Sequence, residues 1–160
     1  MPSNIVIKCS NTIAAKGWNI AFAESASAGR MAAEFSMTEK SGAILRGGIV
    51  CYEVFIKEQI LNVPHSMIEK CTPESADVTK ILAQQTLKIF NSKIAVGITG
   101  LTTPGGSETK EKPVGTMFFH IITPHDKISH HEVFKGTPEE IVLQAIDKTA
   151  QLIIESIASL

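Results

Sequence analysis

The stretch from Ile20 to Arg30 constrains the fold most, because its residue pattern changes there from that of a strand to that of a helix. Its first residues form an apolar run, which is typical of a buried strand. From Ala28 onward, apolar residues recur at i, i+3, i+4 and i+7, which is helical spacing. Units of this kind build folds in which helices cover a mostly parallel sheet.

The turn inside this stretch carries Glu24, Ser25, Ser27 and Gly29. A helix start presents free backbone N–H groups and the positive end of the helix dipole, so it suits an anion or an oxyanion. Two interpretations of the serines stay open at this point. Ser25 or Ser27 only caps the helix, or the hydroxyls take part in chemistry.

The size of the chain favours one core, and we expect a single domain over residues 1–160. The net charge of –1 gives no reason to expect a nucleic-acid surface. No apolar run has transmembrane length, the first residues do not open a signal peptide, and the three cysteines show no paired spacing. These features predict a soluble cytoplasmic protein without a membrane partner. Arg30 and Arg46 are the only arginines, so an anionic ligand would depend mainly on lysines, backbone amides and hydroxyls.

The remaining elements follow from periodicity and from turn residues. We expect helices at residues 3–16, 26–37, 54–61, from a Thr72 cap to about 90, and from a Thr137 capping box onward, with strands at 18–23, 47–52, 93–98, 114–122 and 128–134. The three early strands should be parallel and the last two an antiparallel hairpin. The expected fold is α/β, a three-layer α/β/α sandwich with a mixed, mostly parallel sheet.

Chemistry-bearing residues follow three of these strands, at the sheet edge where such folds bind ligands. Ser25 follows the first strand, Tyr52 the second with Lys57 shortly after it, and Thr99 with Gly100 the third. The five histidines lie outside these strand ends, so the base for a serine nucleophile would be a lysine of lowered pKa. The alternatives are a solvated Lys57 and a half-buried Tyr52 with only a packing role.

The chain contains no metal-ligand spacing, no P-loop and no dinucleotide-binding glycine fingerprint. His130 and His131 are adjacent in an expected strand, so their side chains should point to opposite faces. The residues alone therefore give no signal of a metal site or of these two nucleotide-binding motifs.

Five motifs in a fixed order carry a family resemblance. They are Ala23-Glu24-Ser25 with Gly29; Arg46 to Tyr52; Lys57 with Leu61-Asn62-Val63-Pro64; Ile98-Thr99-Gly100 with Pro104-Gly105-Gly106; and Lys112-Pro113-Val114-Gly115-Thr116. With these motifs the chain resembles the C-terminal domain of the CinA family (competence/damage-inducible protein), whose stand-alone forms are nicotinamide mononucleotide deamidases. The resemblance covers essentially the whole chain.

The resemblance implies hydrolysis of the amide of a small pyridine nucleotide to the acid, with release of ammonia. It implies no cofactor, and it implies a homo-oligomer. Matched by position, Ser25 would be the nucleophile, Lys57 its base and Tyr52 an assisting group. The substrate-binding residues would be Ser27, Gly29, Thr99, Gly100 and Arg46.

The chain also departs from the family pattern around this site. Ala26 and Ala28 replace a cysteine and a glycine, and two of the residues at 101–103 are larger than those of the family. The arginine that the family often carries near the last helix is missing, with Lys135 close to its position. Three functions therefore stay open: a nicotinamide mononucleotide deamidase, a catalytically silent domain that binds a nucleotide or assembles as an oligomer, and an amidase for an unphosphorylated amide.

Overall fold

The structure is a computed structural model that describes residues 1–160. Its elements in chain order are α1 (Asn4–Ala15), β1 (Ile20–Glu24), α2 (Arg30–Ser36), α3 (Ser41–Ile44), β2 (Leu45–Val50), α4 (Val54–Gln59), α5 (His65–Cys71), α6 (Ala76–Phe90), β3 (Ile94–Gly100), β4 (Thr116–Ile122), β5 (Lys127–Val133) and α7 (Pro138–Ala158).

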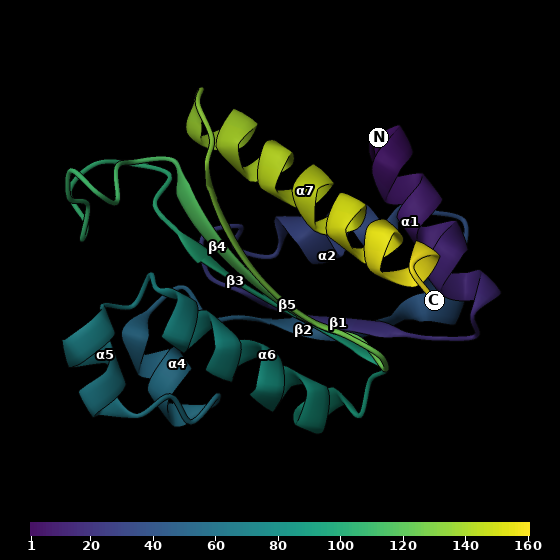
Figure 1. The fold of residues 1–160 in the computed structure, drawn as a ribbon, viewed down its shortest axis with the longest axis horizontal. Helices are drawn as coiled ribbons and strands as arrows, with labels where there is room; N and C mark the ends of the chain where they lie inside the picture. Colours follow the sequence, from purple (N-terminus) through teal and green to yellow (C-terminus); the bar gives the residue numbers. More distant parts are fainter.

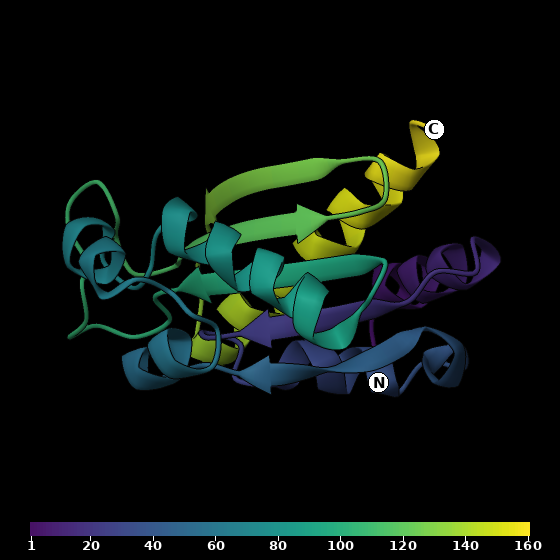
Figure 2. The ribbon, with the colours of Figure 1, turned by 90° about the horizontal axis from the view of Figure 1, so that it is seen from below.

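The five strands form one sheet in the order β2-β1-β3-β4-β5. β1 pairs in parallel with β2 and β3, whereas β4 runs antiparallel to both β3 and β5. The expected parallel strands and the hairpin are therefore confirmed. In Figure 2 the arrowheads of β1, β2 and β3 point to the end of the molecule where α4 and α5 lie.

Helices cover both faces of the sheet, which confirms the expected three layers. Figure 1 shows α1, α2 and α7 on one face, with α4, α5 and α6 on the other. The first face holds the larger core, of 21 buried residues, in which Phe22 packs against Phe35 with ring centroids 5.2 Å apart. All five residues of β1 are buried, because both faces of this strand are covered.

Two helices begin later than expected. The helix expected from residue 26 begins at Arg30, because residues 25–29 form a turn that ends in a left-handed Gly29 (φ 93°). The cap expected at Thr72 is wrong. Ser75 caps α6 by accepting a hydrogen bond from the Val78 N–H, while Thr72 ends α5 with φ 68°.

Two short helices, α3 and α5, were not expected. The helical spacing from Val78 also predicts that Ile89 faces inward on α6; this is wrong, because Ile89 is 50% exposed. The capping box at Thr137 is confirmed, with hydrogen bonds in both directions between Thr137 and Glu140. No helix in the chain combines the length and the apolar character needed to cross a membrane.

Candidate functional site

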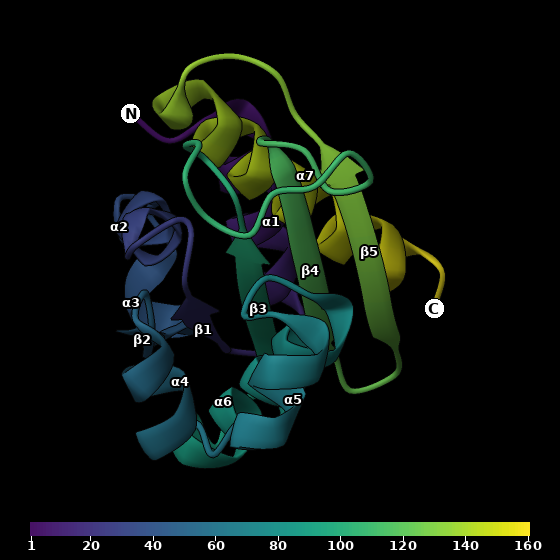
Figure 3. The ribbon, with the colours of Figure 1, turned by 90° about the vertical axis from the view of Figure 1, so that its left-hand side faces the viewer.

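A cavity of about 240 Å³ lies at the carboxyl ends of the parallel strands. Its lining comes from the turn after β1, the end of β2, the segment before α6 and the loop after β3; the lining residues are Ser25, Ala26, Tyr52, Glu74 and 100–106. Figure 3 looks onto this end of the sheet and shows the loop between β3 and β4 passing in front of the strand ends. The chemistry-bearing strand ends of the sequence thus meet at one cavity.

Backbone pairing brings the ends of β1 and β2 together. The Cys51 N–H donates to the Glu24 carbonyl at 2.8 Å, so the residues that follow each strand are neighbours. α4 begins shortly after β2, and its Lys57 side chain turns back toward the strand end. Lys57 Nζ lies 2.9 Å from Ser25 Oγ. The solvated position considered for Lys57 is therefore wrong, because the side chain is only 1% exposed.

The surroundings of Lys57 suit a neutral amine. Its Nζ also lies 2.7 Å from the Cys51 carbonyl oxygen and 3.2 Å from that of Tyr52. A neutral amine donates its two N–H groups to these carbonyls and directs its lone pair at the Ser25 hydroxyl. Burial lowers the pKa of Lys57, and the charges of Cys51 and Glu74 offset part of this shift. The geometry and the lowered pKa together permit Lys57 to accept a proton from Ser25.

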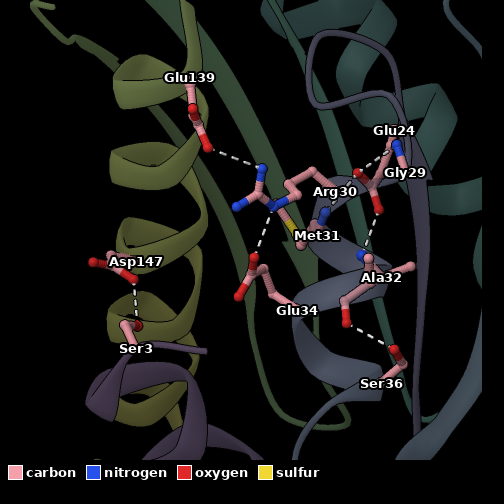
Figure 4. Close-up of polar contacts among 11 residues, drawn as sticks. Ser3, Glu24, Gly29, Arg30, Met31, Ala32, Glu34, Ser36, Glu139 and Asp147 are labelled. Atoms are coloured by element: carbon pink, nitrogen blue, oxygen red, sulfur yellow. Dashed lines mark hydrogen bonds and ion pairs between the residues drawn. The ribbon is translucent and has the colours of Figure 1, made fainter. Parts of the chain in front are cut away.

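A buried carboxylate holds the turn that carries Ser25. Glu24 Oε2 accepts hydrogen bonds from Ser27 Oγ at 2.6 Å and from the Gly29 and Met31 N–H groups, each at 3.0 Å. Its Oε1 accepts from the Ala32 N–H at 2.7 Å (Figure 4). The N-terminus of α2 is therefore capped by an anion that belongs to the chain itself.

This cap changes the interpretation of the serines and of the glycine. The hydroxyls of Ser25 and Ser27 accept no hydrogen bond from an α2 N–H; only the Ser27 carbonyl does, from Arg30 at 2.8 Å. The Ser27 hydroxyl and the Gly29 N–H both donate to Glu24, so each supports the turn. Ser25 is 6% exposed and is the one hydroxyl of the turn that lines the cavity.

Three other expected site residues lie near the cavity in different ways. The side chain of Tyr52 is 64% exposed and lines the cavity, so the half-buried packing position is wrong; its carbonyl, not its hydroxyl, contacts Lys57. Gly100 lines the cavity as well. Thr99 is fully buried, and its hydroxyl lies 2.8 Å from that of Thr79 on α6, so it faces that helix.

Neither arginine of the chain reaches the cavity. Arg46 is exposed near the start of β2, whereas the cavity lies beyond the end of that strand. Arg30 on α2 pairs with Glu34 at 2.7 Å and with Glu139 of α7 at 3.3 Å, as Figure 4 shows. Within this chain, Arg46 does not join the other expected site residues.

Sequence reasoning missed the residues that anchor the loop after β3. Lys112 Nζ donates to Thr72 Oγ1 at 2.7 Å, to the Glu74 carbonyl at 3.0 Å and to Ser107 Oγ at 2.9 Å. Ser107 Oγ in turn donates to Glu74 Oε2 at 2.6 Å. The left-handed Thr72 of this network is a strained conformation for a β-branched residue. Lys112 lies in the fifth motif of the resemblance, but neither that motif nor the strain at Thr72 shows in the sequence that these residues meet.

The backbone of the same loop donates hydrogen bonds to a carboxylate of the loop itself. Glu108 accepts hydrogen bonds from the N–H groups of Gly105 and Gly106, each at 2.8 Å. These bonds hold the pKa of Glu108 below its usual range. The chain has no group of three or more His, Cys, Asp or Glu side chains placed to hold a metal ion.

Known proteins resemble this chain in both sequence and structure. The model of the CinA C-terminal domain family matches residues 3–157. A CinA-like protein of Prochlorococcus marinus is 37% identical over 152 residues, which are 91% of this chain and 35% of that protein. One from Desulfotalea psychrophila is 33% identical over 79% of this chain and 30% of that protein. The chain thus spans about a third of the length of these curated relatives.

Solved structures share the fold. A CinA superfamily protein from Klebsiella pneumoniae 700603 has a TM-score of 0.91 at 23% identity, covering 98% of this chain and 97% of that one. A competence/damage-inducible protein from Agrobacterium tumefaciens has a TM-score of 0.88 at 22% identity, covering 97% of each chain. At sequence identities this low, the similarity to these structures shows the fold alone.

Proposed function

The chain belongs to the CinA C-terminal domain family, and on that premise we propose that it hydrolyses a carboxamide to the acid and ammonia, as nicotinamide mononucleotide deamidases do. The observation that carries the proposal is the 2.9 Å contact between Lys57 Nζ and Ser25 Oγ at the cavity. A serine hydroxyl is a weak nucleophile, and a buried amine beside it is a suitable base.

The first half of the proposed reaction forms an ester on Ser25. Neutral Lys57 accepts the hydroxyl proton while Ser25 Oγ attacks the amide carbon, which gives a tetrahedral oxyanion. The ammonium of Lys57 then returns this proton to the amide nitrogen. The C–N bond breaks, ammonia leaves and the acyl group stays on Ser25.

The second half uses water. Lys57 takes a proton from a water molecule, the resulting hydroxide attacks the ester carbon, and the C–Oγ bond breaks as Lys57 returns the proton to Ser25. The candidate donors to the oxyanion are the N–H groups of Ala26 and Ser27. They follow Ser25 in the turn and donate to no backbone carbonyl, and Ala26 lines the cavity.

One set of contacts favours a second candidate function, a domain without catalytic activity that binds a nucleotide or assembles as an oligomer. The backbone N–H groups of the α2 terminus and of Gly105–Gly106 are already occupied by Glu24 and Glu108. A phosphorylated nucleotide would find these groups taken. The buried Lys57, by contrast, has no evident role in a domain that only binds, because burying a lysine is unfavourable.

Release of ammonia separates the two functions. Nicotinamide mononucleotide and nicotinamide are each incubated with the wild type and with Ser25→Ala, and ammonia is measured by a coupled enzymatic assay. We expect release by the wild type that falls by at least about a hundredfold in Ser25→Ala. Absence of any Ser25-dependent release from either compound favours the silent domain.

A further inference from the structure

The strand β2 lies at one edge of the sheet, and its outer side pairs with nothing in the chain. It is the first strand in the order β2-β1-β3-β4-β5, and residues 47–50 make no backbone hydrogen bond outside the sheet. The Cys51 N–H points toward β1, where it donates to the Glu24 carbonyl. Because backbone groups alternate in direction along a strand, Gly48 and Val50 direct theirs away from the sheet.

This edge has little of the protection that keeps edge strands from pairing. Lysine, proline and bulges are the usual means of blocking such an edge. The register of β2 shifts only at its start, between Leu45 and Gly47, and residues 47–50 carry neither a charge nor a proline. The strand at the opposite edge, β5, begins with Lys127 and also carries Glu132. The outer side of β2 is therefore the better template for a further strand.

Exposed apolar side chains continue from the end of β2 onto α4. Val50, Tyr52 and Phe55 are 50%, 64% and 60% exposed and lie within six residues of one another. Exposed apolar groups that gather in this way mark a surface that another protein covers. Since Tyr52 also lines the cavity, a partner bound at this edge lies beside the candidate site.

We propose that β2 pairs antiparallel with β2 of a second copy of this chain, about a two-fold axis at Gly48, and that the partner's Arg46 thereby reaches the cavity. The charges at the two ends of the strand favour this direction. Arg46 precedes the open segment and Glu53 follows it, and both are exposed without an ion pair in the chain. An antiparallel pair brings these opposite charges toward each other, whereas a parallel pair brings like charges together.

The pairing accounts for the position of Arg46, which lies at the wrong end of its own strand for the cavity. Within one chain Arg46 precedes Val50 by four residues, which is roughly 13 Å along a strand. With the axis at Gly48, the partner's Arg46 lies opposite Val50, at the Cα separation of about 5.5 Å that hydrogen-bonded pairs have.

A guanidinium at this position supplies what the cavity of a single chain lacks. No arginine of the chain lines the cavity. Arginine binds phosphate and carboxylate groups through paired hydrogen bonds, so the partner's Arg46 would hold an anionic group of the substrate. The strand pairing does not depend on the proposed amide hydrolysis, whereas this role of the partner's Arg46 rests on it.

The mass in solution tests the pairing. Sedimentation velocity of the wild type should give twice the mass of the chain. Val50→Lys places a charge on the open edge and should give the mass of one chain. Val133→Lys is the matched control, because Val133 lies on the opposite edge strand and is similarly exposed (46%), and it should remain a dimer.

A disulfide tests the register of the pairing. In a chain that carries Cys71→Ser, the double variant Arg46→Cys/Val50→Cys should form a disulfide between two copies, because residues 46 and 50 lie opposite each other within disulfide reach. Arg46→Cys alone should form none, because the two copies of residue 46 lie at opposite ends of the paired strands.

Mixed dimers test the role of the partner's Arg46. Arg46→Ala and Ser25→Ala chains are co-expressed with different affinity tags, and the mixed dimer is isolated. Each variant alone should release ammonia from nicotinamide mononucleotide at least about tenfold more slowly than the wild type. In the mixed dimer the subunit that keeps Ser25 receives Arg46 from the other one, so the rate should return to about half that of the wild type.

Three results would overturn the inference. A single-chain mass at every concentration tested, or a dimer without the 46–50 disulfide, would overturn the pairing. A mixed dimer no faster than Arg46→Ala would overturn the role of the partner's Arg46.

A wild type that releases no ammonia counts against the proposed function and leaves the mass and the disulfide as tests of the pairing. Affinity then tests the role of the partner's Arg46. In Ser25→Ala, the affinity for nicotinamide mononucleotide, measured by calorimetry, should fall at least about tenfold when Val50→Lys is added. An equal affinity would overturn this role.

Discussion

The substitution Glu24→Gln tests whether the buried carboxylate holds the turn that carries Ser25. Glu24 accepts three hydrogen bonds at Oε2 and one at Oε1. Glutamine retains one acceptor oxygen, so it can preserve the three bonds at Oε2, while its NH₂ group then faces the Ala32 N–H. Loss of charge weakens each retained bond by about 1 kcal/mol, and the unpaired N–H costs about 1–3 kcal/mol.

Removal of a buried charge offsets part of this loss, because the neutral amide is easier to desolvate. We therefore expect a net loss of about 2–4 kcal/mol in the free energy of unfolding. For a chain of this size that loss lowers the melting temperature by about 4–16 °C. Ammonia release should fall as well, since the turn no longer holds Ser25 against Lys57.

Urea unfolding followed by circular dichroism measures the effect. Glu139→Gln is the matched control, because Glu139 lies at a largely exposed position and makes only a 3.3 Å pair with Arg30. The control should stay within about 0.5 kcal/mol of the wild type. A Glu24→Gln protein with the same m-value and a midpoint equal to that of the wild type would refute the reasoning.

Three further predictions follow from the same contacts. Lys57→Met should reduce Ser25-dependent hydrolysis by about 10²–10⁴-fold, and the wild-type rate should rise with pH as the lowered pKa of Lys57 is passed. In the unfolded chain Lys57 keeps its proton up to about pH 10.5, whereas in the folded chain it loses the proton at a lower pH. Between these two pKa values the wild-type free energy of unfolding, relative to that of Lys57→Met, should therefore rise with pH. A difference that stays constant with pH contradicts the burial argument. Tyr52→Phe should change kcat by less than about threefold, because the Tyr52 hydroxyl contacts neither member of the pair; a hundredfold loss would assign the hydroxyl a chemical role. Gly115→Ala should lower the free energy of unfolding, measured in a thermal melt, by about 2–4 kcal/mol, because φ is 100° and the added Cβ meets the Phe134 carbonyl oxygen. Gly105→Ala, where φ is 97° and the added Cβ meets open space, should lower it by less than half as much.

Much of the fold could be predicted from the sequence because its local signals agree with the tertiary structure. The apolar run before Glu24 and the capping box at Thr137 are local features, and both lie where they were expected. The prediction of the α6 cap at Thr72 is wrong because the same residue also ends α5. Thr72-Pro73-Glu74 is a good helix start, yet the chain enters it from α5 through a left-handed Thr72, and Ser75 becomes the cap.

The sequence placed Ser25 and Tyr52 at one sheet edge, and the family resemblance assigned Lys57 as the base. Whether Lys57 reaches Ser25 could not be predicted, because it depends on how α4 turns the side chain back toward the strand end. The role of Glu24 could not, since a carboxylate before a helix looks the same whether it faces a ligand or the backbone. Glu74 and Lys112 come from segments 38 residues apart whose contact depends on the loop after β3. Arg46 shows the limit of a motif match, because a matched position can lie at the far end of its strand from the cavity.

Acylation of Ser25 tests the central claim most directly. The wild-type protein is mixed with an activated nicotinate ester, quenched within one turnover, digested and analysed by mass spectrometry. We predict one nicotinoyl group on the peptide that contains Ser25, formed much more slowly in Lys57→Met and absent in Ser25→Ala. An unmodified Ser25 in the wild type, or equal labelling in Lys57→Met, would contradict the proposal that Lys57 activates Ser25 as a nucleophile.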